Sequence, residues 1–129
     1  DILNYNNIVD NFDLISIDID GNDYWVWKDL KYKPKVVVIE YNSSLGLKES
    51  KSISYDQNYL WDHTMYFGAS ALALINLGRR KGYSLISSTP RNLIFLRDDL
   101  IKNKFQVIDI SRVKSNIKRK PTNKKFIDV

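Results

Sequence analysis

The stretch Asp13-Leu14-Ile15-Ser16-Ile17-Asp18-Ile19-Asp20-Gly21 decides how this chain folds. Its β-branched residues alternate with polar ones, which is typical of a strand with one face toward a core. The alternation separates two sets of side chains: Ile15, Ile17 and Ile19 on one face, and Ser16, Asp18 and Asp20 on the other. We therefore predict a buried strand that ends in acidic side chains and a glycine.

A second strand follows the first after a short helix. Asn22 and Asp23 favour a helix start, and they precede the aromatic-rich stretch 24–30. Pro34 then interrupts the chain, and residues 36–42 form a nearly continuous apolar run. Such a run is typical of a strand covered on both faces in a parallel sheet. The unit is β-α-β, and its right-handed crossover makes the two strands parallel.

Polar side chains gather where these two strands end. In α/β sheets, ligands bind outside the carboxyl ends of the strands, and both ends lie at one edge here. Oxygen atoms at this edge suit a hydroxyl substrate or a hard cation such as Mg²⁺. A carboxylate that ends an apolar strand is costly unless it is paired or faces a site. The candidates are Asp18, Asp20, Glu40 and Asn42, with Asp20, Glu40 and Asn42 as possible metal ligands. A simple turn and helix cap over residues 20–23 is the alternative.

The rest of the chain supplies a long loop, a helix and a hairpin. Residues 43–67 are polar and dotted with aromatics, with no clear period, and a loop of this length is usually functional or disordered. Ser70 to Gly82 has the pattern of a helix with basic residues and a glycine at its end. Residues 83–87 and 93–96 are predicted to form a terminal hairpin, and residues 105–110 a short strand or docking segment.

The long loop carries a second set of candidates. His63 could serve as a general base, because its pKa lies near neutrality, or could simply be a polar surface residue. The aromatic residues could line an acceptor pocket or pack the loop onto the sheet; they are Tyr55, Tyr59, Trp61 and Tyr66. In the preceding helix, Trp25 and Trp27 cannot both face the core.

Composition narrows the class of protein. The chain has 129 residues with 43% hydrophobic residues and no cysteine, which predicts one domain without disulfides or thiolate metal sites. No apolar run approaches the roughly 20 residues of a membrane span, and no secretory signal is seen, so we predict a soluble, cytoplasmic protein. The chain begins at Asp1 without an initiator methionine, which favours a piece cut from something longer.

The positive charge belongs to the C-terminus. Residues 1–100 hold 11 Lys and Arg against 13 Asp and Glu, whereas residues 101–129 hold 9 against 2. We therefore divide the chain into an α/β unit over 1–100 and an extension over 101–129. The basic stretch 112–125 has no periodicity, so a solvated tail is favoured over nucleic-acid binding.

Four segments together resemble a known family: residues 13–23, 36–42, 68–70 and 77–83. Over about residues 8–100 the chain is similar to the C-terminal half of FkbM-type S-adenosylmethionine-dependent methyltransferases. The resemblance implies a Rossmann-like half-domain of the class I methyltransferase type, with parallel strands followed by a C-terminal antiparallel hairpin. It implies methyl transfer from S-adenosylmethionine, usually to an oxygen of a sugar or polyketide-like acceptor.

The positions and chemistry of the candidates, taken together with the resemblance, predict roles for individual residues. Catalysis would involve Asp18, Asp20, Glu40 and His63; acceptor binding Asn22, Asn42, Tyr55, Tyr59 and Trp61; and cofactor binding Asp18 and Gly21. Family members carry a glycine-rich turn upstream of this region. The five glycines here form no such cluster. The chain is thus either a fragment of a methyltransferase or a stand-alone remnant.

The strand at residues 13–20 would be central in the complete fold but forms an edge here. Its exposed backbone groups predict pairing with a second copy or a partner chain. A catalytically inactive binding or assembly module that uses this edge or the basic tail is therefore the alternative function. A metal-assisted enzyme that works without S-adenosylmethionine is a third possibility.

Overall fold

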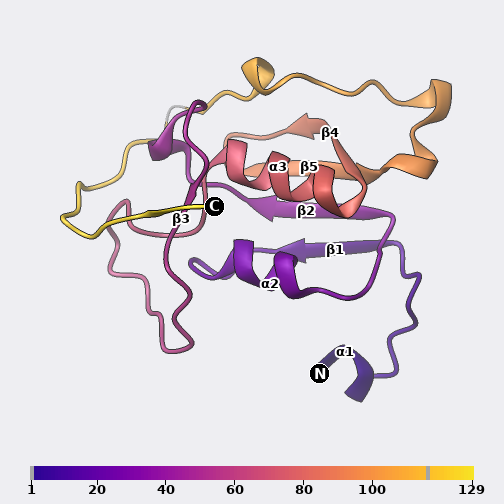
Figure 1. Ribbon diagram of the computed structural model, residues 1–129, viewed down its shortest axis with the longest axis horizontal. Coiled ribbons are helices and arrows are strands. Elements are labelled where there is room, and N and C mark those ends of the chain that lie inside the picture. The colour runs from indigo at the N-terminus through magenta and orange to yellow at the C-terminus, as the bar shows by residue number, and fades with distance from the viewer. Residues whose placement is uncertain (1, 116) are drawn as a thin grey trace.

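Four strands form one mixed sheet in the computed structural model, which describes residues 2–115 and 117–129 (Figure 1). They are β1 (Leu14–Ile17), β2 (Val36–Glu40), β4 (Tyr83–Ser88) and β5 (Asn92–Arg97), in the spatial order β1-β2-β5-β4. β1 and β2 are parallel, and β5 is antiparallel to both of its neighbours. The predicted parallel pair and terminal hairpin are confirmed, within a sheet whose pairings are mostly antiparallel.

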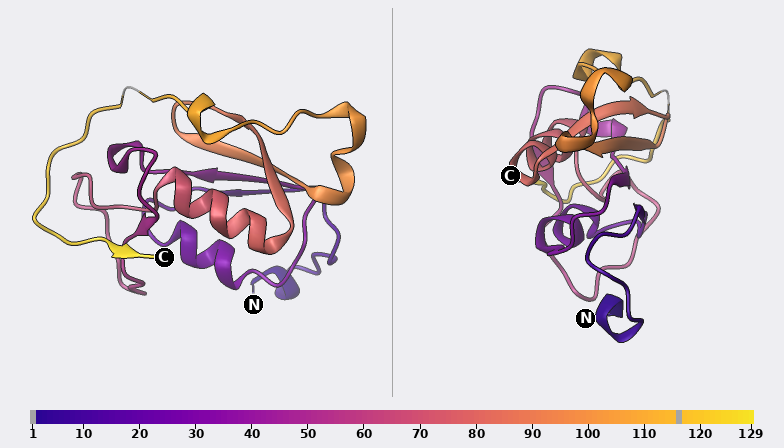
Figure 2. Two further views of the ribbon diagram at one scale, coloured as in Figure 1. Left: turned by 45° about the horizontal axis from the view of Figure 1, so that its top comes forward. Right: turned by 90° about the vertical axis from the view of Figure 1, so that its right-hand side faces the viewer.

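The register aligns the carboxyl ends of the two parallel strands. Ile17 of β1 lies beside Ile39 of β2, so Asp18, which follows β1, and Glu40, the last residue of β2, lie at the same level. The long loop and the C-terminal residues both lie beyond this end of the sheet, next to the arrowheads of β1 and β2 (Figures 1 and 2). The topology therefore brings three distant parts of the chain to one edge.

Two helices cover one face of the sheet (Figure 2). The helix α2 (Asp23–Asp29) connects β1 to β2, and α3 (Ala71–Lys81) precedes the hairpin. The Ser70 side chain caps α3 by accepting a hydrogen bond from the Ala73 amide at 3.2 Å, and Gly82 ends it in the left-handed conformation, φ 86°. The helix predicted between Ser70 and Gly82 is confirmed, because both caps are local signals.

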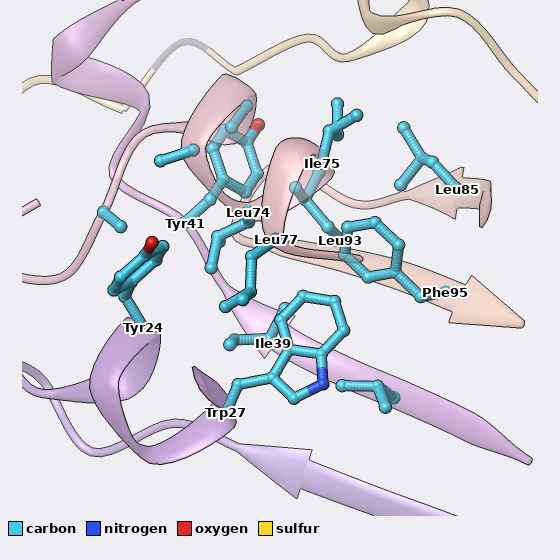
Figure 3. Close-up of a cluster of buried hydrophobic side chains, with 14 of the residues drawn as sticks. Tyr24, Trp27, Ile39, Tyr41, Leu74, Ile75, Leu77, Leu85, Leu93 and Phe95 are labelled. Carbon is cyan, nitrogen blue, oxygen red and sulfur yellow. The ribbon is translucent and has the colours of Figure 1, made fainter. Parts of the chain in front are cut away.

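The core lies between these helices and the sheet (Figure 3). Trp27 is fully buried, with its ring centroid 4.8 Å from that of Phe95. Gly78 of α3 permits this packing, since a Cβ there would lie 3.0 Å from the Trp27 ring. Trp25 is only partly buried and donates its indole N–H to the Ile53 carbonyl at 2.9 Å. As its helical position predicts, only one of the two tryptophans belongs to the core.

The opposite face of the sheet is less covered than predicted. Val37 and Ile39 are fully buried, but Val36 and Val38 on the other face are half-buried, and Leu14 is 55% exposed. The predicted coverage of residues 36–42 on both faces therefore holds only in part: Glu40 and Asn42 are buried, but Val36 and Val38 are half-buried because α2 and α3 lie on the same side of the sheet. Ile19, which alternation placed in the core, follows the end of β1 and is 52% exposed.

Short elements complete the chain. They are the helix α1 (Ile2–Tyr5), the 3₁₀ turns η1 (Ser43–Leu45), η2 (Asp98–Leu100), η3 (Lys102–Lys104) and η4 (Ile110–Arg112), and the short strands β3 (Lys51–Ser52) and β6 (Ile127–Asp128). Residues 105–110 form no strand within the described ranges. Instead they dock along β4, where the Ile108 amide donates to the Leu85 carbonyl at 2.9 Å.

The C-terminal strap, residues 113–115 and 117–129, docks on the body through its backbone, whereas the lysine side chains of the stretch predicted to be solvated are exposed: Lys114, Lys118, Lys120, Lys124 and Lys125. Val113 is buried in the core, and β6 pairs antiparallel with β3. The Val129 amide also donates to the Ser50 carbonyl at 3.0 Å. These contacts could not be predicted from the polar composition of the segment, because they join residues that are far apart in the sequence. None of the helices in the described ranges is long and apolar enough to cross a bilayer.

Candidate functional site

Three carboxylates meet at the shared carboxyl end of β1 and β2. Oxygen atoms of Asp18, Asp20 and Glu40 all lie within 4.8 Å of one another. Asp18 and Asp20 are exposed to solvent, whereas Glu40 is only 6% exposed. The structure therefore brings together the three acids that the parallel strand ends placed at one edge. We call these three residues the carboxylate cluster.

A fourth acid, Asp23, holds the turn that carries two members of this cluster. Its buried carboxylate accepts hydrogen bonds from the backbone amides of Ile19 at 3.0 Å and Gly21 at 2.9 Å. Between them, Asp20 adopts the left-handed conformation, φ 59°, which is uncommon for a residue other than glycine. The sequence pattern predicted Asp23 only as part of a helix start. Its position in the first helical turn, where free amides attract carboxylates, was the available signal.

Burial and crowding change the electrostatics of the cluster. The pKa of Glu40 is raised to about 7, chiefly by desolvation and also by the negative charges of Asp18, Asp23 and Asp20, while the positive charge of Arg119 opposes the shift. Desolvation also raises the pKa of Asp23. The Glu40 Oε2 atom is buried and has no hydrogen-bond partner in the described part of the chain. Such a group can take up a proton near neutrality or bind a cation.

The two asparagines predicted to bind substrate are engaged in holding the long loop. The side chain of Asn42 is fully buried, and its amide donates to the carbonyls of Met65 at 2.7 Å and Phe67 at 2.8 Å. Its oxygen accepts from the Ser44 amide at 3.0 Å. Both amide hydrogens are thus used in fastening the loop, and a role of Asn42 toward an acceptor or a metal stays a prediction.

Asn22, which follows the carboxyl end of β1, also holds the long loop. It occupies the N-cap position of α2 without making a side-chain cap, and its amide donates to the Asp56 carbonyl at 2.7 Å. Its oxygen accepts from the Asp56 amide at 3.3 Å. The predicted cap is therefore replaced by a long-range contact to the loop.

Gly21 is explained by the aromatic ring that lies against it. A Cβ at this position would lie 2.2 Å from Cδ1 of Tyr59, closer than real atoms approach. The Tyr59 hydroxyl donates to the Tyr66 carbonyl, and desolvation holds its pKa well above its usual range. Packing alone thus accounts for the glycine, and its role toward a cofactor stays a prediction.

The remaining loop candidates lie outside the carboxylate cluster. His63 is exposed, with φ 63°, and its ring centroid lies 4.8 Å from that of Trp61. It does not belong to the carboxylate cluster. The Trp61 indole donates to the Thr64 carbonyl at 2.8 Å, which favours loop packing. Tyr55 is 62% exposed and makes an edge contact with Trp25, at 6.4 Å between centroids.

The C-terminal strap brings a cation to this region that sequence reasoning missed. The Arg119 guanidinium carbon lies 5.3 Å from the ring centroid of Trp61 and 5.4 Å from that of Phe67. Its Nε atom is buried without a hydrogen-bond partner in the described residues. Lys124 of the strap also forms an ion pair with Asp62, at 2.8 Å. The loop and the strap therefore hold each other in place.

Comparison of the chain with protein-family models, with curated proteins and with solved structures finds no match.

Proposed function

We propose that this chain is the acceptor-side half of a Rossmann-like S-adenosylmethionine-dependent methyltransferase of the FkbM type, which methylates a hydroxyl of a sugar or polyketide-like acceptor. The observation that carries the proposal is the convergence of Asp18, Asp20 and Glu40 at the carboxyl ends of two parallel strands. The strand order, with an antiparallel β5, also agrees with what the resemblance implies for the last strand.

The carboxylate cluster would bind the acceptor hydroxyl. The exposed oxygens of Asp18 and Asp20 can accept its hydrogen bond, which increases electron density on the oxygen that receives the methyl group. A carboxylate that accepts this hydrogen bond can also take the proton when the new bond forms. Tyr55, with its exposed ring, is the aromatic candidate for contact with the acceptor.

The residues of this chain do not by themselves fit the cofactor. Its five glycines form no glycine-rich turn. The space next to Gly21, at the end of β1, is filled by the ring of Tyr59. The proposal therefore gives this chain the acceptor side, with the determinants for S-adenosylmethionine supplied by another segment.

A methyl-transfer assay tests the proposal. The reading frame containing Asp1 is expressed with the residues encoded before it, and transfer of a labelled methyl group is measured across sugar and polyketide acceptors. We expect activity that Asp20→Asn lowers by roughly 10²-fold or more, while the matched surface variant Asp29→Asn leaves it unchanged. Absence of transfer to every acceptor, together with a reading frame lacking a glycine-rich strand-turn-helix, would contradict the proposal.

A second candidate is an assembly module, favoured by the edge of β1. Within the described ranges β1 pairs with β2 alone, and nearby apolar side chains are exposed, with Leu14 at 55% and Val9 at 70%. A free strand edge beside exposed apolar groups can add a strand from a second copy or another protein. Light scattering that shows only monomer at high concentration would exclude self-assembly through this edge.

A further inference from the structure

We propose that Asp18, Asp20 and Glu40 bind a divalent cation of the Mg²⁺ or Mn²⁺ class. The function of that cation, to hold and polarise the acceptor hydroxyl, rests on the proposed methyltransferase function. Binding of the cation does not, because it depends only on the carboxylate cluster and can be measured without cofactor or acceptor.

The spacing of the oxygen atoms suits a common ion. Two oxygens bound to one Mg²⁺ at about 2.1 Å lie at most roughly 4.2 Å apart, and for larger cations at about 2.5 Å the limit is roughly 5 Å. The three carboxylates offer oxygen atoms within 4.8 Å of one another before any ion draws them together. Small rotations of the exposed Asp18 and Asp20 side chains would therefore complete the coordination.

The buried oxygen of Glu40 is an independent sign of a missing ligand. Glu40 is 6% exposed, and its Oε2 atom has no hydrogen-bond partner in the described residues. A buried acceptor without a partner is costly, and proteins rarely keep one unless an ion, a water molecule or a ligand satisfies it. Glu40 contributes a carboxylate oxygen to the cluster, so a cation bound there lies beside this carboxylate and can take Oε2 as a ligand.

The turn around Asp20 fixes the backbone that carries its carboxylate before any ion binds. The two hydrogen bonds from the Ile19 and Gly21 amides to Asp23 fix the backbone on either side of Asp20. Asp18 and Asp20 face solvent, which leaves room for the water ligands that Mg²⁺ usually retains. The site therefore has one buried ligand and an open side that an acceptor hydroxyl could enter.

The charges around the cluster favour a cation. Asp23 adds a fourth carboxylate close enough to affect Glu40, and Arg119 is the basic group that opposes them. Arg119, in the strap, packs against the rings of Trp61 and Phe67 in the long loop. Its positive charge should weaken binding of a second cation, so removing it should strengthen binding.

Manganese binding to the isolated chain tests the proposal. Mn²⁺ is titrated into the metal-free chain, and free Mn²⁺ is measured by electron paramagnetic resonance. We expect one saturable site that Asp20→Asn and Glu40→Gln each weaken by roughly 10-fold or more. Arg119→Gln should tighten binding by about 2- to 5-fold. Asp29→Asn, which removes a fully solvent-facing acid in an ion pair with Lys31, should not change it.

Melting temperatures measured in EDTA separate loss of the site from loss of the fold. Glu40→Gln keeps the shape of the side chain and removes a buried charge, so this variant should melt no lower than the original chain. Absence of saturable binding, or binding that Asp20→Asn and Glu40→Gln leave unchanged, would overturn the proposal. Because neither S-adenosylmethionine nor acceptor is present, these results are independent of the methyl-transfer assay.

Discussion

The helix-covered face of the sheet and its carboxyl edge follow opposite physical rules. On the covered face, Leu74, Leu93 and Phe95 are fully buried among other apolar side chains. At the edge, three carboxylates lie close together, and one oxygen of the buried Glu40 has no partner in the described residues. The first arrangement lowers the free energy of the fold and the second raises it. Local conflict of this kind is typical of functional sites.

Removing the largest core side chain should have the greatest effect on stability. Trp27→Ala would leave a cavity beside Phe95 and should lower the free energy of unfolding by about 3 to 5 kcal/mol. Urea denaturation measures the change. Trp25→Ala is the matched control, because Trp25 is only partly buried and should cost clearly less. Equal losses for the two variants would contradict the assignment of Trp27 to the core.

At the carboxyl edge, stability should depend on the protonation of Glu40. Its pKa of about 7 lies above the ordinary value of 4.5, so the folded chain binds the proton more tightly than the unfolded chain. In EDTA, stability should therefore fall as the pH rises from about 4.5 to 7, by roughly 2 to 3 kcal/mol in total. Urea denaturation at pH 5 and pH 8 measures this fall.

Glu40→Gln tests the origin of that pH dependence. The variant should reduce the slope without abolishing it, because Asp23 also has a raised pKa and contributes in the same direction. The other charged groups that act on residue 40, namely Asp18, Asp20 and Arg119, remain in the variant. If the slope of stability against pH is unchanged in Glu40→Gln, the protonation of Glu40 is not the cause of the pH dependence.

A smaller effect on stability is expected at Gly21, where the ring of Tyr59 packs tightly against the carboxyl edge. Gly21→Ala would place a methyl group against the Tyr59 ring and should lower the free energy of unfolding by about 1 to 3 kcal/mol. A double-mutant cycle with Tyr59→Ala checks the cause. If the ring is the obstacle, Gly21→Ala should cost much less once the ring is removed. Additive losses would point to another origin.

The smallest expected effect concerns Ser70, which lies between the two regions. Its hydroxyl accepts from the Ala73 amide to cap α3 and from the Lys51 amide in the loop, and it donates to the Glu49 carbonyl at 2.6 Å. Ser70→Ala should lower the free energy of unfolding by about 1 kcal/mol. Thermal denaturation measures it, with Ser70→Thr expected to retain part of the cap. A loss of the same size in both variants would argue against the capping role.

The candidate site was predictable where it depended on chain direction alone. Two parallel strands must end at one edge, so the meeting of Asp18, Asp20 and Glu40 followed from their positions in the sequence. The roles of Asn42 and Gly21 were not predictable. Each is decided by loop residues at least 20 positions away, namely Met65 and Phe67 for one and Tyr59 for the other.

The sequence by itself determined the elements of this protein. Apolar periodicity marked the strands, and Ser70 and Gly82 bounded a helix, because these signals act between residues that are near neighbours. Only the tertiary structure decided that both helices cover one face, that the basic C-terminal strap returns to pair with β3, and that Arg119 lies over Trp61. These features depend on contacts between distant segments, whose energies are not contained in any local pattern.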